Sequence, residues 1–244
     1  MIERLAKRSP PFAAWLTAHE GAAALACGVQ HAWREFHAGE FSAAIEHGSR
    51  LGPLGASVAN KAAAVHTLYS RSFGPRELAM LEAAVTRGEA AVELLPQYPN
   101  AHYLLALALG RYSQRISIVR ALTQGFAGRV RAHLERTLEL EPQHAEAHLA
   151  FGLYHAEIVA KLGGLGARLT YGASGDAAME CFKRALKLAP ESPIVHMEYA
   201  NGLLLLDAAR HREQAHGLYA QAAALEPRDA MERLDVQRAK RGPG

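Results

Sequence analysis

Four apolar stretches of this chain each end at a proline, and this feature most limits what the chain can fold into. The stretches are AAVELLP at 90–96, LERTLELEP at 134–142, FKRALKLAP at 182–190 and YAQAAALEP at 219–227. Proline ends a helix because it lacks the backbone N–H and restricts the residue before it. After each of the first three prolines, a short polar turn precedes another apolar-periodic stretch. This order predicts repeated helix pairs, as in an α-solenoid.

The composition of the chain favours an all-α protein. Half of the residues are hydrophobic and 21% are charged, so the chain is too apolar to be disordered. Alanine is the commonest residue, and it is the strongest helix former. We therefore expect an all-helical fold and exclude a sandwich or a barrel.

The spacing of the stop prolines predicts insertions in two of the repeats. Pro96, Pro142, Pro190 and Pro227 are 46, 48 and 37 residues apart. A tetratricopeptide-type repeat has about 34 residues. The two longer intervals must therefore contain additional residues between the first and second helices of their pairs.

These additional residues form two insertions, 111–130 and 159–176. We expect the first to be an amphipathic helical extension with one apolar side. That side consists of Ile116, Val119 and Leu122. The second is rich in glycine, which predicts a turn before a helix that is capped by Ser174 or Asp176. An anion held by backbone amides and Arg168 is the alternative for this loop.

The order of small and aromatic residues resembles the tetratricopeptide repeat family. In that family, the second helix carries a small residue, an aromatic residue four positions later, another small residue and then a proline. Two segments match this order, Ala178, Phe182, Ala185 and Pro190, and Ala215, Tyr219, Ala222 and Pro227. The best-preserved first helix contains His148, Phe151 and Gly152. A weaker, earlier unit contains Gly39, Phe41 and Ala44.

With its two insertions, the stretch 100–201 is similar to the regulator-of-microtubule-dynamics family and its bacterial relatives. It is also similar to the T-component of tripartite ATP-independent periplasmic transporters. The resemblance implies an α-α superhelix, a tetratricopeptide-like solenoid of about five helix pairs. We expect one domain over 1–244, with divergent pairs over 12–95, the best-matching repeats over 96–227 and a short tail over 228–244. Microtubule regulation does not follow, because a fold does not define a function.

The resemblance also implies that the first helix of each pair lines a concave groove. The matching positions are mostly apolar, namely Asn100, Tyr103, Leu107, Arg111, Glu146, Leu149, Leu153, Ala156, Glu157, Ile194, Met197, Asn201 and Leu204. An apolar groove must be covered or filled. We predict a non-catalytic protein–protein interaction scaffold that binds a peptide or helix in this groove.

Other occupants of the groove are open alternatives. One is a small hydrophobic ligand, which would make the chain a ligand-binding accessory protein of a transport system. A second copy of the chain could also cover the groove in a homo-oligomer. In the last alternative, the extension 111–130 covers it.

Histidines at equivalent positions are candidate functional residues. His102, His148 and His196 each follow a stop proline by six residues, where the family pattern places a packing aromatic. We favour a structural role, in which each ring hydrogen-bonds to a neighbouring helix, over a ladder of imidazoles that contacts one ligand. His144 and His148 could share a metal face, but His155 lies about two turns further along the helix, and the spacing lacks the H-E-x-x-H arrangement. The sequence therefore predicts no metal and no cofactor.

Catalytic and nucleic-acid-binding functions have no support in the sequence. It contains no G-x-S-x-G motif, and we predict that the chain is not an enzyme. The net charge is +3 with scattered basic residues, which gives no concentrated basic face for nucleic acid.

The expected location is the cytoplasm. Cys27 and Cys181 lie in apolar helical contexts, which predicts buried thiols in a reducing compartment. No apolar run approaches the ~20 residues that span a bilayer. The first 28 residues partly imitate a signal peptide, but Pro10 and Pro11 interrupt their apolar region. Export to the periplasm is the alternative.

Overall fold

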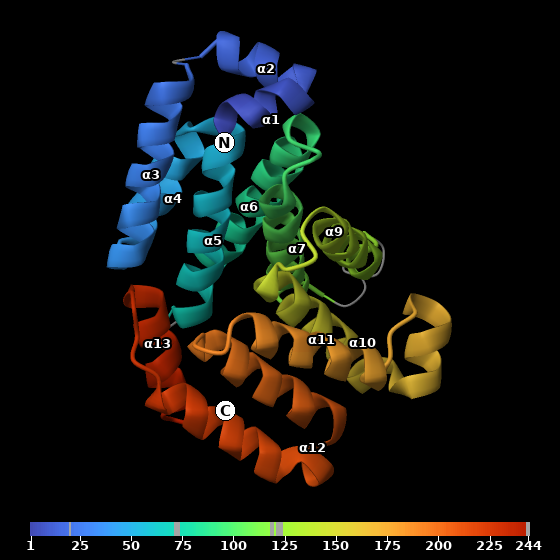
Figure 1. Cartoon of the computed structure of the whole chain (residues 1–244). Helices are drawn as coiled ribbons and strands as arrows, with labels where there is room; N and C mark the ends of the chain where they lie inside the picture. The colour runs from blue at the N-terminus through green and yellow to red at the C-terminus, as the bar shows by residue number, and fades with distance from the viewer. Residues whose placement is uncertain (20, 71–73, 118–119, 121–123, 243–244) are drawn as a thin grey trace. The chain divides into compact units, whose positions relative to one another are not determined.

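The regular secondary structure of the chain is helical, as the sequence predicts. The computed structural model describes residues 1–19, 21–70, 74–117, 120 and 124–242. Within these residues the chain forms twelve helices and no strand (Figure 1). The helices divide between two compact units, Met1–Leu140 and Glu141–Gly244. The single domain expected for 1–244 stays a prediction.

The stop prolines lie just beyond the ends of helices. Pro96 follows α6 (Pro75–Leu94), Pro142 follows α9 (Phe126–Leu140), Pro190 follows α11 (Gly175–Leu188), and Pro227 follows α12 (Pro193–Ala224). Both α12 and α7 (Pro99–Ser113) begin at a proline. Proline suits this position because the first N–H groups of a helix have no partner within it. Prolines therefore mark both the ends and the starts of the repeats.

Unit 1 contains three helix pairs and two short N-terminal helices, α1 (Ile2–Arg8) and α2 (Pro10–Thr17). The pairs are α3 (Ala22–Ala38) with α4 (Phe41–Arg50), α5 (Gly52–Tyr69) with α6, and α7 with α9. The first helices also contact one another, because α5 packs against both α3 and α7. This side-by-side order of first helices is that of a helical solenoid.

Helix α5 is buried along most of its length. Glycines allow α4 to approach it closely, since a Cβ atom at Gly48 would lie 2.8 Å from Val58 Cγ1. Asn60 connects α5 to α6, because its Nδ2 donates to the Ala84 carbonyl at 2.9 Å and its Oδ1 accepts from Arg87 Nε at 3.0 Å. These bonds satisfy a buried amide and align the two helices.

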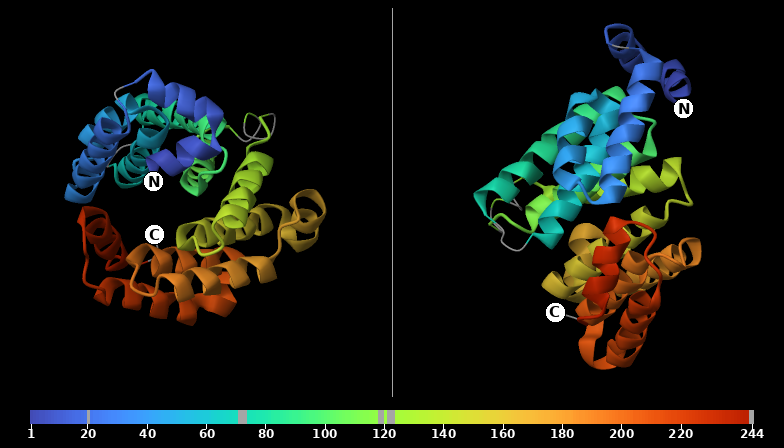
Figure 2. Two further views of the ribbon diagram at one scale, coloured as in Figure 1. Left: turned by 45° about the horizontal axis from the view of Figure 1, so that its top comes forward. Right: turned by 90° about the vertical axis from the view of Figure 1, so that its left-hand side faces the viewer.

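Unit 2 contains two helix pairs followed by a last helix. In the first pair, α10 (Ala145–Tyr171) packs against α11. The second pair is α12, whose two halves meet at Asp207, where φ is −163° and ψ is 95°. The Asp207 carboxylate accepts from the Arg210 N–H at 3.0 Å and so caps the second half. The last helix, α13 (Ala230–Ala239), packs against α12 (Figures 1 and 2). The segment 228–244, expected to be a short tail, therefore contains a helix.

The core of unit 2 is organised around one aromatic ring. Phe182 of α11 is fully buried, and its ring stacks on Tyr199 with centroids 5.0 Å apart. A Cβ atom at Gly152 of α10 or at Gly202 of α12 would collide with this ring. Glycine is therefore required where these first helices pass Phe182, as the repeat register predicts for Gly152.

The insertion 111–130 differs from the single helical extension that the sequence predicts. Helix α7 ends at Ser113, residues 114–117 are not helical, and α9 begins at Phe126. The Ser113 hydroxyl donates to the Gly110 carbonyl at 2.8 Å, which favours the end of the helix there. Of the predicted apolar side, Val119 and Leu122 lie outside the described residues.

The glycine-rich insertion 159–176 is more helical than expected. Helix α10 continues through it to Tyr171 with a kink at Gly163, where φ is 69°, and is capped by Gly172, where φ is 62°. Both positions favour glycine because other residues rarely adopt positive φ. Ser174 then caps α11, as predicted, since its Oγ accepts from the Ala177 N–H at 3.2 Å.

Candidate partner-binding surface

The predicted groove residues of unit 2 lie on α10 and on the first half of α12. These two helices contact each other, and we call their shared surface the first-helix surface of unit 2. Leu153, Ile194 and Leu204 are half-buried and pack against the edge of the core. Each therefore presents apolar area that a partner could cover.

Several predicted groove residues are core residues instead. The buried ones are Tyr103, Leu149, Ala156 and Met197. Met197 is 0% exposed, so its side chain packs inside the chain and reaches no partner in this structure. The half-buried ones are Asn100, Leu107, Arg111, Glu146, Leu153, Glu157, Ile194, Asn201 and Leu204. A first helix that lies between neighbouring helices buries a wide stripe of its surface. The spacing of residues along such a helix therefore does not distinguish core residues from groove residues. That these positions form a groove stays a prediction.

The amide of Asn201 is engaged within unit 2. Its Nδ2 donates to Glu198 Oε2 at 2.9 Å, and the Tyr219 hydroxyl donates to its Oδ1. Burial raises the pKa of Tyr219, and the nearby Glu198 carboxylate raises it further. The three side chains connect the two halves of α12.

A buried lysine lies next to a predicted groove position of unit 1. Lys61 of α5 is buried, and its Nζ lies 5.6 Å from the centroid of the Tyr103 ring on α7. A cation at this distance from an aromatic ring is stabilised by the negative face of the ring. The sequence did not indicate that Lys61 is buried beside an aromatic ring. The alanine-rich run KAAAVH shows no periodic pattern of polar residues from which the orientation of Lys61 could be inferred.

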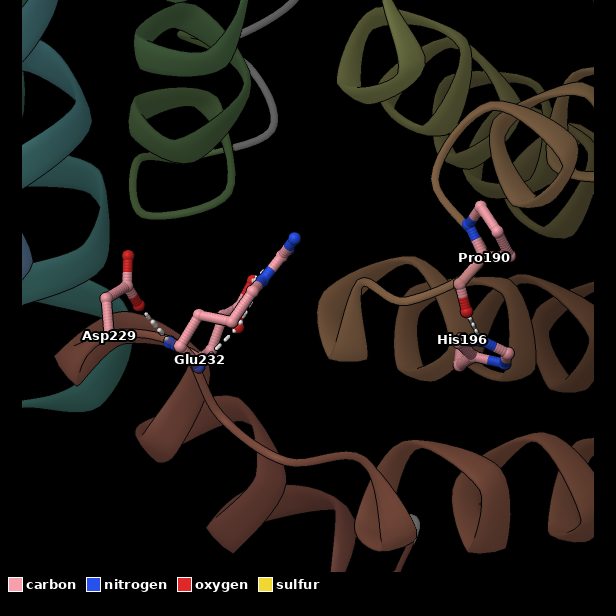
Figure 3. Close-up of polar contacts among 5 residues, drawn as sticks. Pro190, His196, Asp229 and Glu232 are labelled. Atoms are coloured by element: carbon pink, nitrogen blue, oxygen red, sulfur yellow. Dashed lines mark hydrogen bonds and ion pairs between the residues drawn. The ribbon is translucent and has the colours of Figure 1, made fainter.

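The three equivalent histidines have one shared structural role. His102, His148 and His196 each place Nε2 on the carbonyl oxygen of the stop proline six residues earlier, at 3.0, 3.0 and 2.7 Å. Figure 3 shows this bond for His196 and Pro190. A carbonyl oxygen only accepts, so Nε2 carries the proton. Each ring thus satisfies the backbone of the turn before its own helix, a structural role whose partner is this turn and not the neighbouring helix that we expected.

One of these histidines also pairs with a second histidine. The Nδ1 atoms of His102 and His133 are 3.0 Å apart. Because His102 Nε2 donates to Pro96, its Nδ1 accepts, and His133 Nδ1 donates. Burial, His102 and Arg129 lower the pKa of His133 to about 4. Burial also lowers the pKa of His102, although the hydrogen bond to the Pro96 carbonyl acts in the opposite direction and raises it. Both rings are neutral at pH 7.

The histidines of α10 have separate environments. His144 caps the helix, since its Nδ1 accepts from the Ala147 N–H at 3.1 Å. His148 bonds to Pro142, and the buried His155 packs against the Phe151 ring at 4.6 Å between centroids. Neither thiol is buried as expected, because Cys181 is half-buried and Cys27 is exposed. The alanine-rich stretch around Cys27 conceals which face of α3 is outward.

A pocket of about 580 Å³ lies in unit 2 away from the predicted groove residues. Its lining combines lysine and glutamine side chains with apolar ones, namely Lys183, Leu186, Lys187, Tyr199, Gln214, Gly217, Leu218 and Gln221. It is formed by α11 and both halves of α12. The repeat pattern gave no signal for it, since most of these positions belong to second helices.

The paired helices and their side-by-side first helices define a tetratricopeptide-like helical repeat protein. The crystal structure of TTC0263, a thermophilic tetratricopeptide repeat protein of Thermus thermophilus, is similar, with a TM-score of 0.62. The match covers 88% of this chain and 98% of that chain at 19% identity, which shows the shared fold. The family model of regulator of microtubule dynamics protein 1-3 matches residues 60–239, so the chain belongs to this family.

A comparison with curated proteins found no sequence that matches the chain. Across the part of the chain that the structure describes, every helix is too short or too polar to cross a membrane. The similarity to the T-component of periplasmic transporters stays a prediction.

Proposed function

We propose that this chain is a non-catalytic protein–protein interaction scaffold that binds a peptide or a helix on the first helices of its repeats. Helical repeat proteins use such extended surfaces for binding. The observation that carries the proposal is the set of three half-buried apolar side chains, Leu153, Ile194 and Leu204, that pack against the core of unit 2. A partner that covers them would gain about 25 cal/mol per Å² of apolar area.

Charged residues on α10 suggest the chemistry of the partner. Glu146 and Glu157 are half-buried on the same helix as Leu153. They lie seven residues before and four residues after it, which places the three side chains along one side of a helix. Glu157 also contacts Lys161, whose Nζ lies 3.5 Å from Glu157 Oε2, so a basic residue of a partner would share this carboxylate with Lys161. The partner that we propose is an amphipathic segment with apolar anchors and basic residues beside them.

The experiment uses a phage-displayed library of random peptides selected on the purified full chain. Enriched peptides are synthesised, labelled and titrated by fluorescence polarisation. Leu153→Glu should weaken binding at least tenfold, because it places a charge among apolar anchors. The matched control is Leu165→Glu, because Leu165 is 74% exposed and lies on the same helix beyond the kink. Circular dichroism of each variant checks that helicity is retained.

Three results would contradict the proposal. They are a selection that enriches no peptide, equal binding by wild type and Leu153→Glu, and loss of binding in the Leu165→Glu control alone. Native mass spectrometry that finds a stoichiometric small molecule would instead favour the ligand-binding alternative. The cytoplasmic location and a homo-oligomer also stay predictions, and light scattering during size-exclusion chromatography tests the latter.

A further inference from the structure

Two histidines and a glutamate meet on the first helix pair of unit 1. His31 and Glu35 lie four residues apart on α3, so they share one face of that helix. His47 comes from α4, which returns alongside α3 after a tight turn. The turn depends on Gly39, where φ is 91°, a value that glycine adopts without strain.

The side chains already converge to within metal-binding reach. His47 Nδ1 lies 2.7 Å from Glu35 Oε1 and 2.9 Å from Glu35 Oε2. His31 Nε2 lies 3.2 Å from Glu35 Oε1, and the two imidazole rings are 5.7 Å apart between centroids. One ligand atom from each of the three side chains lies within 4.8 Å of the others. We propose that His31, Glu35 and His47 bind a zinc ion.

The donor set selects the class of cation. Imidazole nitrogen is a ligand of zinc, copper and nickel, whereas magnesium and calcium prefer oxygen ligands alone. Zinc binds nitrogen and carboxylate oxygen at about 2.0–2.2 Å in a tetrahedron, which places neighbouring ligand atoms about 3.4 Å apart. Small rotations of the three side chains therefore suffice, and the hydrogen bond from His47 to Glu35 is replaced by two metal bonds.

The exposure of the cluster leaves room for a fourth ligand. Glu35 is 14% exposed at its side chain, whereas His47 is 40% and His31 is 60% exposed. The carboxylate is thus the anchored ligand, and the imidazoles face solvent, where a water molecule completes the tetrahedron. A site with three protein ligands and an open position differs from a closed structural zinc site. The metal would also connect α3 to α4.

The position of the cluster separates it from the features described above. It lies before residue 60, where the match to the family model begins. It also belongs to unit 1, so it is independent of the first-helix surface of unit 2. A failure of the peptide-binding experiment would leave the zinc proposal unaffected.

Isothermal titration of zinc chloride into the untagged, metal-free chain tests the proposal. The expected result is one zinc ion per chain, with binding weakened at least tenfold in His31→Ala, His47→Ala and Glu35→Gln. The matched control is His216→Ala, which removes an exposed histidine from unit 2 and should bind as wild type does. Cobalt(II) should give the intense visible absorption of a tetrahedral site in wild type and lose it in Glu35→Gln.

A second control addresses the competing histidine pair. His102 and His133 also place two nitrogen atoms close together, and His133→Ala removes that pair. Zinc binding that is lost in His133→Ala but retained in His47→Ala would overturn the proposal. So would the absence of zinc binding by wild type, or equal binding by all variants. Circular dichroism confirms that each variant is folded before its titration.

Discussion

The ring of Phe182 occupies the space that a side chain at Gly152 would need, since a Cβ atom there would lie 2.6 Å from two ring carbons. The fully buried ring has no room to move away. Gly152→Ala should therefore lower the free energy of unfolding by about 1–3 kcal/mol, as overpacking does, and Gly152→Leu by more. Urea denaturation of the two variants measures the effect.

A glycine on an open helix surface is the matched control for this prediction. A Cβ atom at Gly217 of α12 meets nothing within 4 Å. Gly217→Ala should therefore raise the free energy of unfolding by up to about 1 kcal/mol, because alanine is the better helix former. If Gly152→Ala were as stable as Gly217→Ala, the close packing on Phe182 would be wrong.

The repeat architecture was predictable because its signals are local. A proline cannot continue a helix that precedes it, so Pro96 and Pro190 correctly marked the boundaries of α6 and α11, which end two residues earlier. The small-aromatic register likewise assigned Phe182 to a second helix and Gly152 to a first helix, whereas their contact emerges from the structure. Helix α13 also had a local signal that went unused, because Asp229 precedes Glu232 by three residues, as at many helix starts.

The candidate sites were less predictable because they depend on packing between helices. The spacing of His31 and Glu35 is visible in the sequence, but His47 joins them only through the turn between α3 and α4. The burial of Met197 follows from neighbours on two sides of its helix, which helical spacing alone does not reveal. The sequence correctly showed that the three histidines occupy equivalent positions. Their partners, the proline carbonyl groups, became apparent only from the geometry of the turn.

The hydrogen bond from His196 to Pro190 is expected to contribute more to stability than its equivalent at His148. The hydrogen bond of His148 is exposed and that of His196 is partly buried, so water can replace the lost donor more readily at Pro142. His196→Phe should lower the free energy of unfolding by about 1 kcal/mol, and His148→Phe by less. Urea denaturation compares the two variants, and equal effects would show that burial does not control the strength of this contact.

The His102–His133 pair makes stability depend on pH. The pKa of His133 is lowered in the folded state to about 4, whereas an unfolded histidine has a pKa of about 6.5. Between these values the unfolded state binds the additional proton, so stability is greatest above about pH 6.5 and falls as the pH decreases toward 4. The loss from this group should be about 1 kcal/mol, since His133 is half-buried and partly screened by solvent.

Thermal unfolding at pH 7.5 and pH 5 measures this dependence in wild type and in His133→Leu. The difference between the two proteins isolates the pair, because His133 is the one residue that differs between them. His133→Leu should lose less stability on acidification than wild type. An equal loss in both proteins would exclude the pair as the source.

Tyr219 and Asn201 should be energetically coupled. The Tyr219 hydroxyl donates to Asn201 Oδ1, and the Asn201 amide donates in turn to Glu198. A double-mutant cycle of Tyr219→Phe and Asn201→Ala should give a coupling energy of about 1 kcal/mol. Additive effects within about 0.3 kcal/mol would mean that the bond does not stabilise α12.

The last helix depends on the cap at its start. Asp229 Oδ1 accepts from the Glu232 N–H at 2.8 Å, and Glu232 Oε2 accepts from the Arg228 N–H at 2.8 Å (Figure 3). Asp229→Ala leaves the Glu232 N–H in the first turn of α13 without this acceptor and should cost about 0.5–2 kcal/mol. Because α13 packs on α12 at the end of unit 2, we expect the loss to appear as local fraying. Hydrogen exchange at Val236 should then accelerate, while exchange at Phe182 in the core stays unchanged. Equal acceleration at both residues would instead show that α13 unfolds together with the core of unit 2.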